Sequence, residues 1–258
     1  MYHSQELLEE IKKECEYERV FSLFEESFLN YKHLFDVSNR IVMDIYKFND
    51  HGPSHLLLTA KRSLQILKIL KNFNYQTTLE KIGKPLEYSY FVVLFGSLFH
   101  DVGNSIHRRD HYVFSVILSE KIIEEISNKF CENPYDSFLL KTFTLNAIYT
   151  HDENVECTTI EGSCVSVADG CDIEEGRSRL AYSLDKKDIH AVSALAIQSI
   201  NIQSYTHTIP ILISVNMKHL AGIFQVDEIL GKKIRSSLLR GLVKIKIDHQ
   251  GEIIEKIF

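Results

Sequence analysis

The chain has 258 residues, of which 45% are hydrophobic and 25% charged, and its formal net charge is −6. This composition is typical of a globular protein and argues against a disordered chain. Because no block of Lys and Arg stands out, we expect no binding to duplex nucleic acid. The N-terminal segment lacks the layout of a signal peptide and no run of about 18 apolar residues occurs, so we expect a cytoplasmic protein without a membrane partner.

The five cysteines are an odd number and include no C-x-x-C pair, which argues against a disulfide framework and against a zinc knuckle. Cys164 and Cys171 lie seven residues apart in a stretch with helical spacing. We therefore expect them to share a buried face of one helix.

Apolar residues recur with helical spacing from residue 4 to about residue 180. Residues 53–70 predict an amphipathic helix that Pro53 and Ser54 open. Residues 87–101, "EYSYFVVLFGSLFHD", are apolar nearly all round and predict a central buried helix with His100 and Asp101 in its last turn. Further helices are expected over 110–130, 134–150 and 159–173, the last with Thr158 and Glu161 as a capping box. We expect residues 1–185 to form a helical domain.

The pattern changes after residue 185. Residues 195–202, 209–217, 242–248 and 252–258 are rich in β-formers, and residues 222–239 between the second and third of these segments form an amphipathic helical pattern. The stretch "DHQGE" predicts the turn of a closing hairpin. The fold class is therefore α+β, with a ββαββ unit over 186–258. This unit has no cluster of His or acidic residues, so we expect it to carry no chemistry and to act as a dimerisation or partner surface.

Imidazoles and carboxylates stand near the ends of the predicted helices. In chain order they are His55, His100, Asp101, His111, His151 and Asp169. Neutral imidazole and carboxylate suit divalent transition metals, and a carboxylate flanked by four histidines can bridge two ions. We therefore consider this set a candidate metal site at the centre of the bundle.

The ordered set H…HD…H…H…D resembles the signature of the HD superfamily of metal-dependent phosphohydrolases, through "HLLLTAKRSLQIL", "LFHDVGNS", "NAIYTHD" and "VSVADGCDIEEGR". The match covers about residues 50–180 and implies an HD-type helical bundle. It also implies that His55, His100, Asp101 and Asp169 hold one metal, and that Asp101 bridges to a second ion held by His111 and His151. The implied cofactors are one or two divalent ions among Mn, Mg, Fe, Ni and Zn.

Three assignments near the motif have alternatives. His107 competes with His111, which we prefer because it opens a helix. His51 is separated from His55 by Gly52 and Pro53, so we interpret it as a loop residue or a partner of a ligand. The pair His151–Asp152 has no suitable histidine and carboxylate after it in the helical part, so the pair at position 100 is preferred.

The resemblance implies hydrolysis of a phosphoester of a nucleotide or a related small phosphorylated molecule, by attack of a metal-bound hydroxide. Asp101 and Asp169 would then be catalytic. Of the arginines near the proposed ligands, we favour Arg177 and Arg179 over Arg108 and Arg109 for contact with the substrate phosphate.

Asn104 stands where the cyclic-dinucleotide branch has Lys and some monophosphate hydrolases have Glu, and the chain lacks the Gly-Tyr-Pro signature of the former. Cyclic di-GMP hydrolysis is therefore disfavoured, and the substrate stays open. There are two alternative functions: a mixed-valent di-iron oxygenase of the same superfamily, and a non-catalytic nucleotide-binding regulator. A homo-oligomer is expected.

Overall fold

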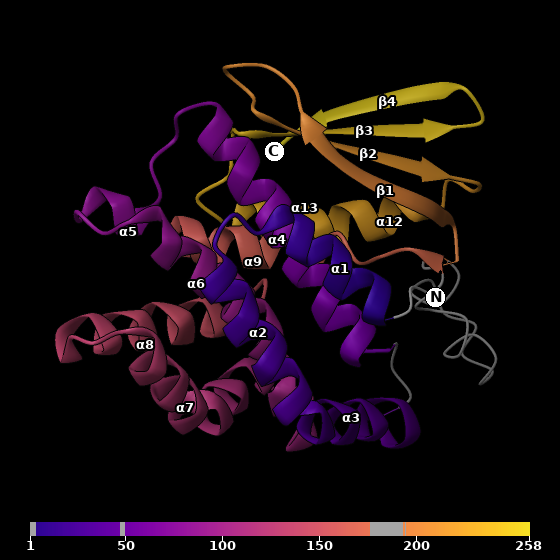
Figure 1. The fold of residues 1–258 in the computed structure, drawn as a ribbon. Helices are drawn as coiled ribbons and strands as arrows, with labels where there is room; N and C mark the ends of the chain where they lie inside the picture. The colour runs from indigo at the N-terminus through magenta and orange to yellow at the C-terminus, as the bar shows by residue number, and fades with distance from the viewer. Residues whose placement is uncertain (1–3, 47–49, 176–192, 194) are drawn as a thin grey trace.

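The computed structural model describes residues 4–46, 50–175, 193 and 195–258. Helices form its N-terminal part and a four-stranded sheet lies in its C-terminal part (Figure 1), which confirms the α+β class. The elements in chain order are α1 (Ser4–Glu14), α2 (Glu18–Asn30), α3 (Lys32–Arg40), η1 (Ile41–Ile45), α4 (Pro53–Asn72), α5 (Thr78–Lys81), α6 (Leu86–Phe99), η2 (Val102–Ser105), α7 (His111–Phe130), α8 (Pro134–Tyr149), α9 (Ile160–Gly170), β1 (Ile197–Ser204), β2 (Ile211–Met217), α12 (Gly222–Gln225), η3 (Val226–Leu230), α13 (Gly231–Arg235), β3 (Val243–His249) and β4 (Glu252–Ile257).

Helix α6 is the centre of the helical part, as its apolar sequence predicts. Every residue from Ser89 to Phe99 is buried. Helices α2, α4, α8 and α9 pack around it, and α7 packs against α8. A helix without a polar face must be covered on all sides, and these neighbouring helices cover α6.

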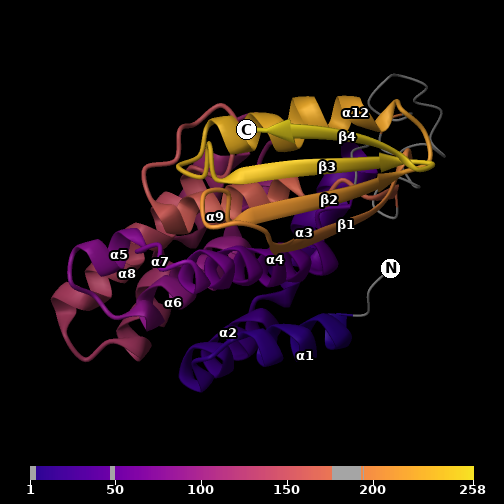
Figure 2. The same ribbon diagram turned by 90° about the horizontal axis from the view of Figure 1, so that it is seen from above.

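The C-terminal part has the expected ββαββ order. Strands β1 and β2 are antiparallel, β2 and β3 are parallel, and β3 and β4 are antiparallel, so the sheet order is β1-β2-β3-β4 (Figure 2). The segments α12, η3 and α13 follow one another without a break and form the crossover between the two parallel strands. The closing hairpin turns at Gln250 and Gly251, which both have positive φ angles.

The sheet unit packs directly on the helical part. Strands β1 and β2 contact α4, and α13 contacts α9. One hydrophobic cluster contains residues of both parts, such as Leu67 of α4 and Ile213 of β2. Two hydrogen bonds add to this packing: Cys157 N donates to the Ser236 carbonyl at 2.8 Å, and Leu238 N donates to Ser163 Oγ at 3.0 Å. The crossover helix is thereby held against α9.

Helix α9 begins and ends differently from the prediction. Its N-cap is Thr159, whose hydroxyl accepts from Gly162 N at 3.0 Å, so the capping box predicted at Thr158 and Glu161 is wrong. The carboxylate of Glu161 is buried and accepts instead from Leu79 N and Ser89 Oγ. The helix ends at Gly170, three residues before the predicted end.

Two other expectations concern burial and membranes. Cys164 and Cys171 are both buried, as predicted, but Cys171 follows the last residue of α9, so the two do not share a face of one helix. Among the residues that the structure describes, none of the helices has both the length and the apolar character needed to cross a membrane.

Candidate metal centre

The six proposed ligands meet around the end of α6. His55 lies in the first turn of α4, His100 and Asp101 follow α6, His111 is the first residue of α7, His151 follows α8, and Asp169 lies in the last turn of α9. Five of the side chains are buried, and that of Asp169 is partly exposed at 12%. The structure therefore brings together residues that are widely separated in the sequence.

The two oxygens of Asp101 face two different pairs of imidazoles. Oδ2 lies 3.3 Å from His55 Nε2 and 3.5 Å from His100 Nε2. Oδ1 lies 3.2 Å from His111 Nε2 and 3.8 Å from His151 Nε2. Asp101 therefore separates two groups of ligand atoms, one on each side of its carboxylate.

Asp169 completes the first of these groups. Its Oδ1 lies 3.3 Å from His55 Nε2 and 3.7 Å from His100 Nε2. The Nε2 atoms of His55 and His100 are themselves 3.1 Å apart, and those of His111 and His151 are 3.0 Å apart. Each pair of imidazoles thus directs its Nε2 atoms toward a common point.

Hydrogen bonds at the opposite nitrogen set the tautomer of three of these histidines. Each Nδ1 bonds an oxygen: Asp172 Oδ2 for His55 at 2.6 Å, the Ser97 carbonyl for His100 at 2.8 Å, and the Ile148 carbonyl for His151 at 2.6 Å. Because a carbonyl oxygen and an ionised carboxylate oxygen only accept, each Nδ1 must donate, and the neutral ring then presents a lone pair at Nε2.

The cluster therefore consists of acceptors that face one another. Nε2 lone pairs of His55 and His100 lie beside carboxylate oxygens of Asp101 and Asp169, an arrangement that is unfavourable in a buried site unless a cation lies between them. Three groups of ligand atoms in this cluster lie close enough to hold an ion: His51–His55–Asp101, His55–His100–Asp169 and His100–Asp101–His151. The donor set fits a divalent metal ion.

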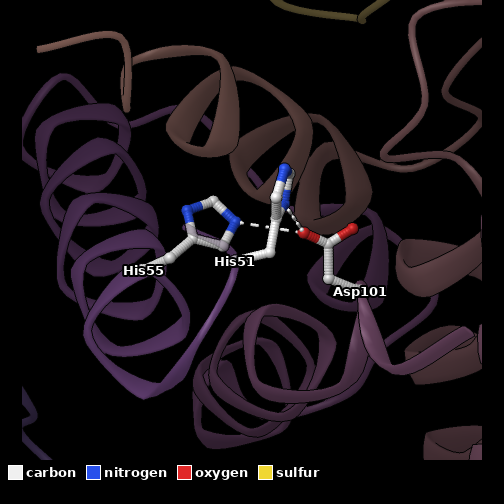
Figure 3. Close-up of side chains that lie close together, drawn as sticks. All are labelled: His51, His55 and Asp101. Atoms are coloured by element: carbon white, nitrogen blue, oxygen red, sulfur yellow. Dashed lines mark hydrogen bonds and ion pairs between the residues drawn. The ribbon is translucent and has the colours of Figure 1, made fainter. Parts of the chain in front are cut away.

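His51 precedes α4 in a loop, as expected, and its ring contacts Asp101. Nδ1 lies 2.5 Å from Asp101 Oδ2, on the side where His55 also approaches (Figure 3). Its backbone N–H donates to Asn39 Oδ1 at 2.8 Å, which fixes the loop. The position allows His51 either to orient Asp101 or to join the first ligand group.

Asn104 holds Asp101 from the other side. Its Nδ2 donates to Asp101 Oδ1 at 2.9 Å and to the Asp101 carbonyl at 3.0 Å, while its own Oδ1 accepts from Arg108 at 3.1 Å. Asn104, which occupies the position that is Lys or Glu in the related motifs, therefore orients the proposed bridging carboxylate of Asp101.

The structure places the remaining candidates away from the cluster or does not describe them. His107 is exposed and bonds the backbone of Arg109, so His111 rather than His107 faces Asp101. Arg109 is also exposed. Arg177 and Arg179, predicted to contact substrate phosphate, lie outside the described residues.

Two buried partners of the cluster were not identified from the sequence. Asp172 bonds His55, and no signal in the sequence marks it beyond its position three residues after Asp169. Lys233 of α13 donates to Asp169 Oδ2 at 2.7 Å, whereas the sequence predicts no site residue in the C-terminal unit. Nothing local could identify Lys233, because only the packing of α13 on α9 brings it there.

The charges of the cluster shift the pKa of its members. Burial raises the pKa of the Asp101 carboxyl, but His51, His100 and His111 outweigh this and hold that pKa well below its ordinary value. Burial likewise opposes ionisation of Asp169, but Lys233 and the neighbouring histidines hold its pKa well below the ordinary value. Burial, together with the neighbouring His100, His111 and Lys233, holds the pKa of His151 well below its usual range. At neutral pH the acids are ionised and His151 is neutral, the states that bind metal.

Comparison with known proteins finds a relative without an assigned function. The uncharacterized protein MJ1020 of Methanocaldococcus jannaschii is 34% identical over 224 residues, which are 86% of this chain and 86% of that protein. No family model matches the chain. No solved structure matches it either.

Proposed function

The chain belongs to the family of the Methanocaldococcus jannaschii protein MJ1020, and we propose that it is an HD-type metal-dependent phosphohydrolase acting on a nucleotide or a related small phosphorylated molecule. One observation carries this proposal: the carboxylate of Asp101 directs one oxygen to His55 and His100 and the other to His111 and His151. A carboxylate placed in this way can bridge two metal ions.

The arrangement of helices supports an HD-type bundle. The proposed ligands are contributed in chain order by α4, the end of α6, the start of α7, the end of α8 and α9, and α6 is the buried central helix. This order agrees with the H…HD…H…H…D signature, in which each ligand stands at a helix end. The resemblance in sequence and the spatial cluster thus support the same assignment.

Two bound divalent ions would supply an activated water and would neutralise charge on the phosphoryl oxygens. The residues of the chain position that chemistry. Asp101 links the two ligand groups, Asp172 orients His55, and Asn104 orients Asp101. Arg177 and Arg179 remain proposed contacts of the substrate phosphate.

The cysteines offer no competing nucleophile. Burial raises the pKa of each: that of Cys15 to about 11, that of Cys171 to about 12, and those of Cys131, Cys157 and Cys164 above the ordinary value. A thiol needs to ionise to attack phosphorus, so these side chains are unreactive near neutral pH. This supports direct attack by water without a covalent phospho-enzyme.

The test is a screen of metal-loaded protein against phosphomonoesters, nucleotides and cyclic nucleotides, with release of phosphate or nucleoside as the readout. We expect hydrolysis that chelator abolishes, that His100→Ala and Asp101→Ala lack, and that His107→Ala retains. Activity equal in all four proteins would refute the site. Turnover that requires dioxygen would refute the phosphohydrolase and favour a di-iron oxygenase.

A further inference from the structure

Lys233 is a buried cation that reaches the metal centre from the C-terminal unit. Its side chain is 5% exposed and lies on α13. The ammonium donates to Asp169 Oδ2 at 2.7 Å and to the backbone carbonyl of His151 at 2.5 Å. One side chain thus contacts a member of the first ligand group and a member of the second.

Because of this contact, the two oxygens of Asp169 have different partners. Oδ1 lies 3.3 Å from His55 Nε2 and faces the proposed ion, whereas Oδ2 accepts from Lys233. We propose that Lys233 is a positioning residue of the metal centre, which holds Asp169 as a ligand through one oxygen and fixes His151 beside it. This role rests on the proposed metal site.

Gly170 leaves the space through which the Lys233 side chain reaches Asp169. A Cβ at Gly170 would lie 2.9 Å from Lys233 Cδ, so only glycine at the end of α9 lets the lysine stem pass at this distance. Leu230 lies beside the same glycine and supplies apolar packing between the crossover and α9. The ammonium at the end of this stem is directed at Asp169 and at the His151 carbonyl.

The neighbouring Lys232 differs from Lys233 because it lies on the surface and contacts no member of the cluster. Lys232 is 47% exposed and pairs with Glu228 one turn earlier at 2.8 Å. A buried ammonium loses its hydration and is tolerated when a carboxylate is paired with it. Lys233 has this partner in Asp169, and Asp169 raises the pKa of Lys233 against the effect of burial.

The experiment replaces each lysine in the full-length chain and uses Co²⁺ as the probe. Lys233→Met keeps the length of the stem and removes the ammonium, and Lys232→Met is the matched control. The absorption of protein-bound Co²⁺ reports its coordination number, because additional ligands weaken the visible bands and shift them to shorter wavelength. Without Lys233, Asp169 can bind through both oxygens.

We expect Lys233→Met to show lower absorption per bound cobalt ion and bands at shorter wavelength than the wild type. The spectrum of Lys232→Met should match that of the wild type. Lys233→Arg retains a cation, so its spectrum should lie closer to that of the wild type than the spectrum of Lys233→Met does. A Lys233→Met spectrum identical to the wild type would overturn the proposal. If the wild type binds cobalt but hydrolyses no phosphoester, the proposed function fails and the role of Lys233 is still decided by the spectrum.

A second measurement needs no variant and applies if Lys233→Met does not fold. Lys233 joins α13 to the ligands, so saturating Co²⁺ should slow backbone hydrogen exchange in residues 231–237 of the wild type. Helix α1, which packs on α2 and α4 and carries no proposed ligand, should change less. Exchange in 231–237 that stays the same when cobalt is bound would overturn the proposal.

Discussion

His55 donates its Nδ1 proton to Asp172 over 2.6 Å, and both side chains are buried. This bond turns His55 Nε2 toward Asp101 and Asp169. Removing the charge in Asp172→Asn should therefore lower the affinity for divalent metal by about 10–100-fold, the usual effect of losing the partner of a metal-binding histidine. Calorimetric titration with Mn²⁺ or Zn²⁺ measures this change.

The matched control for Asp172 is Asp136→Asn. Asp136 accepts from Tyr88 at 3.2 Å and pairs with Lys84, and it contacts none of the proposed ligands. Its replacement should leave metal affinity unchanged. Equal affinity in Asp172→Asn and the wild type would show that Asp172 does not orient a ligand.

Asp101→Ala should remove more metal than any single histidine variant. Its two oxygens face separate ligand groups, so its loss affects both ion positions, whereas His100→Ala removes one ligand from one group. Elemental analysis after metal loading gives the number of ions per chain. The exposed His107→Ala should keep the full complement, and full occupancy in Asp101→Ala would rule out a bridging role.

Asp169→Asn should destabilise the metal-free protein by about 3–5 kcal/mol, because it leaves Lys233 buried without a carboxylate. The double variant Asp169→Asn, Lys233→Met removes both charges and should recover part of this loss. Urea unfolding of the wild type, both single variants and the double variant measures the coupling. Strictly additive changes would mean that the two side chains do not interact.

Gly103→Ala should disrupt the start of α7. A Cβ at this position would lie 2.0 Å from the His111 carbonyl oxygen and 2.3 Å from Ser115 N, and these backbone atoms cannot rotate away. We expect a loss of about 1–3 kcal/mol or more of stability together with lower metal content, since His111 moves with the helix. Gly222→Ala, where the nearest contact is an Ile197 side-chain carbon at 3.1 Å, should have a smaller effect and keep its metal.

The metal-free protein should lose stability in acid in two stages. The pKa of His151 is depressed in the folded protein, so below about pH 6.5 this side chain binds a proton in the unfolded chain but not in the folded one. The free energy of unfolding therefore falls as pH drops below about 6.5. Asp101 and Asp169 have depressed pKa values, so their contribution is complete above the unfolded value of about 4 and is lost as pH falls further. Urea midpoints in chelator across this range test both stages, and His151→Gln should flatten the first.

Local patterns were sufficient for most of the fold and for naming the residues that the cluster brings together. The apolar run that ends at Phe99 predicted the buried helix, and the alternation around Ile245 predicted a strand, because periodicity depends on neighbours in the chain. His55, His100 and Asp101 could be named because each stands at a helix end. Their meeting in space was an expectation from the resemblance.

What could not be predicted depends on contacts between distant segments. Lys233 is 64 residues from Asp169, and its neighbour Lys232 carries the same charge with a surface role. Glu161 had the spacing of a capping residue, but its carboxylate bonds Leu79 and Ser89, because tertiary packing offered it buried donors. A pattern confined to one helix does not contain these partners.

The proposed ligands converge only when the chain is folded, since His55 and its partner Asp172 are 117 residues apart. An unfolded chain offers scattered imidazoles with little affinity, so an ion that occupies the cluster adds its binding energy to folding. At a free concentration about 100-fold above the dissociation constant, this amounts to about 2.7 kcal/mol. Metal supply in the cell would then govern how long each molecule survives proteolysis, independently of any turnover.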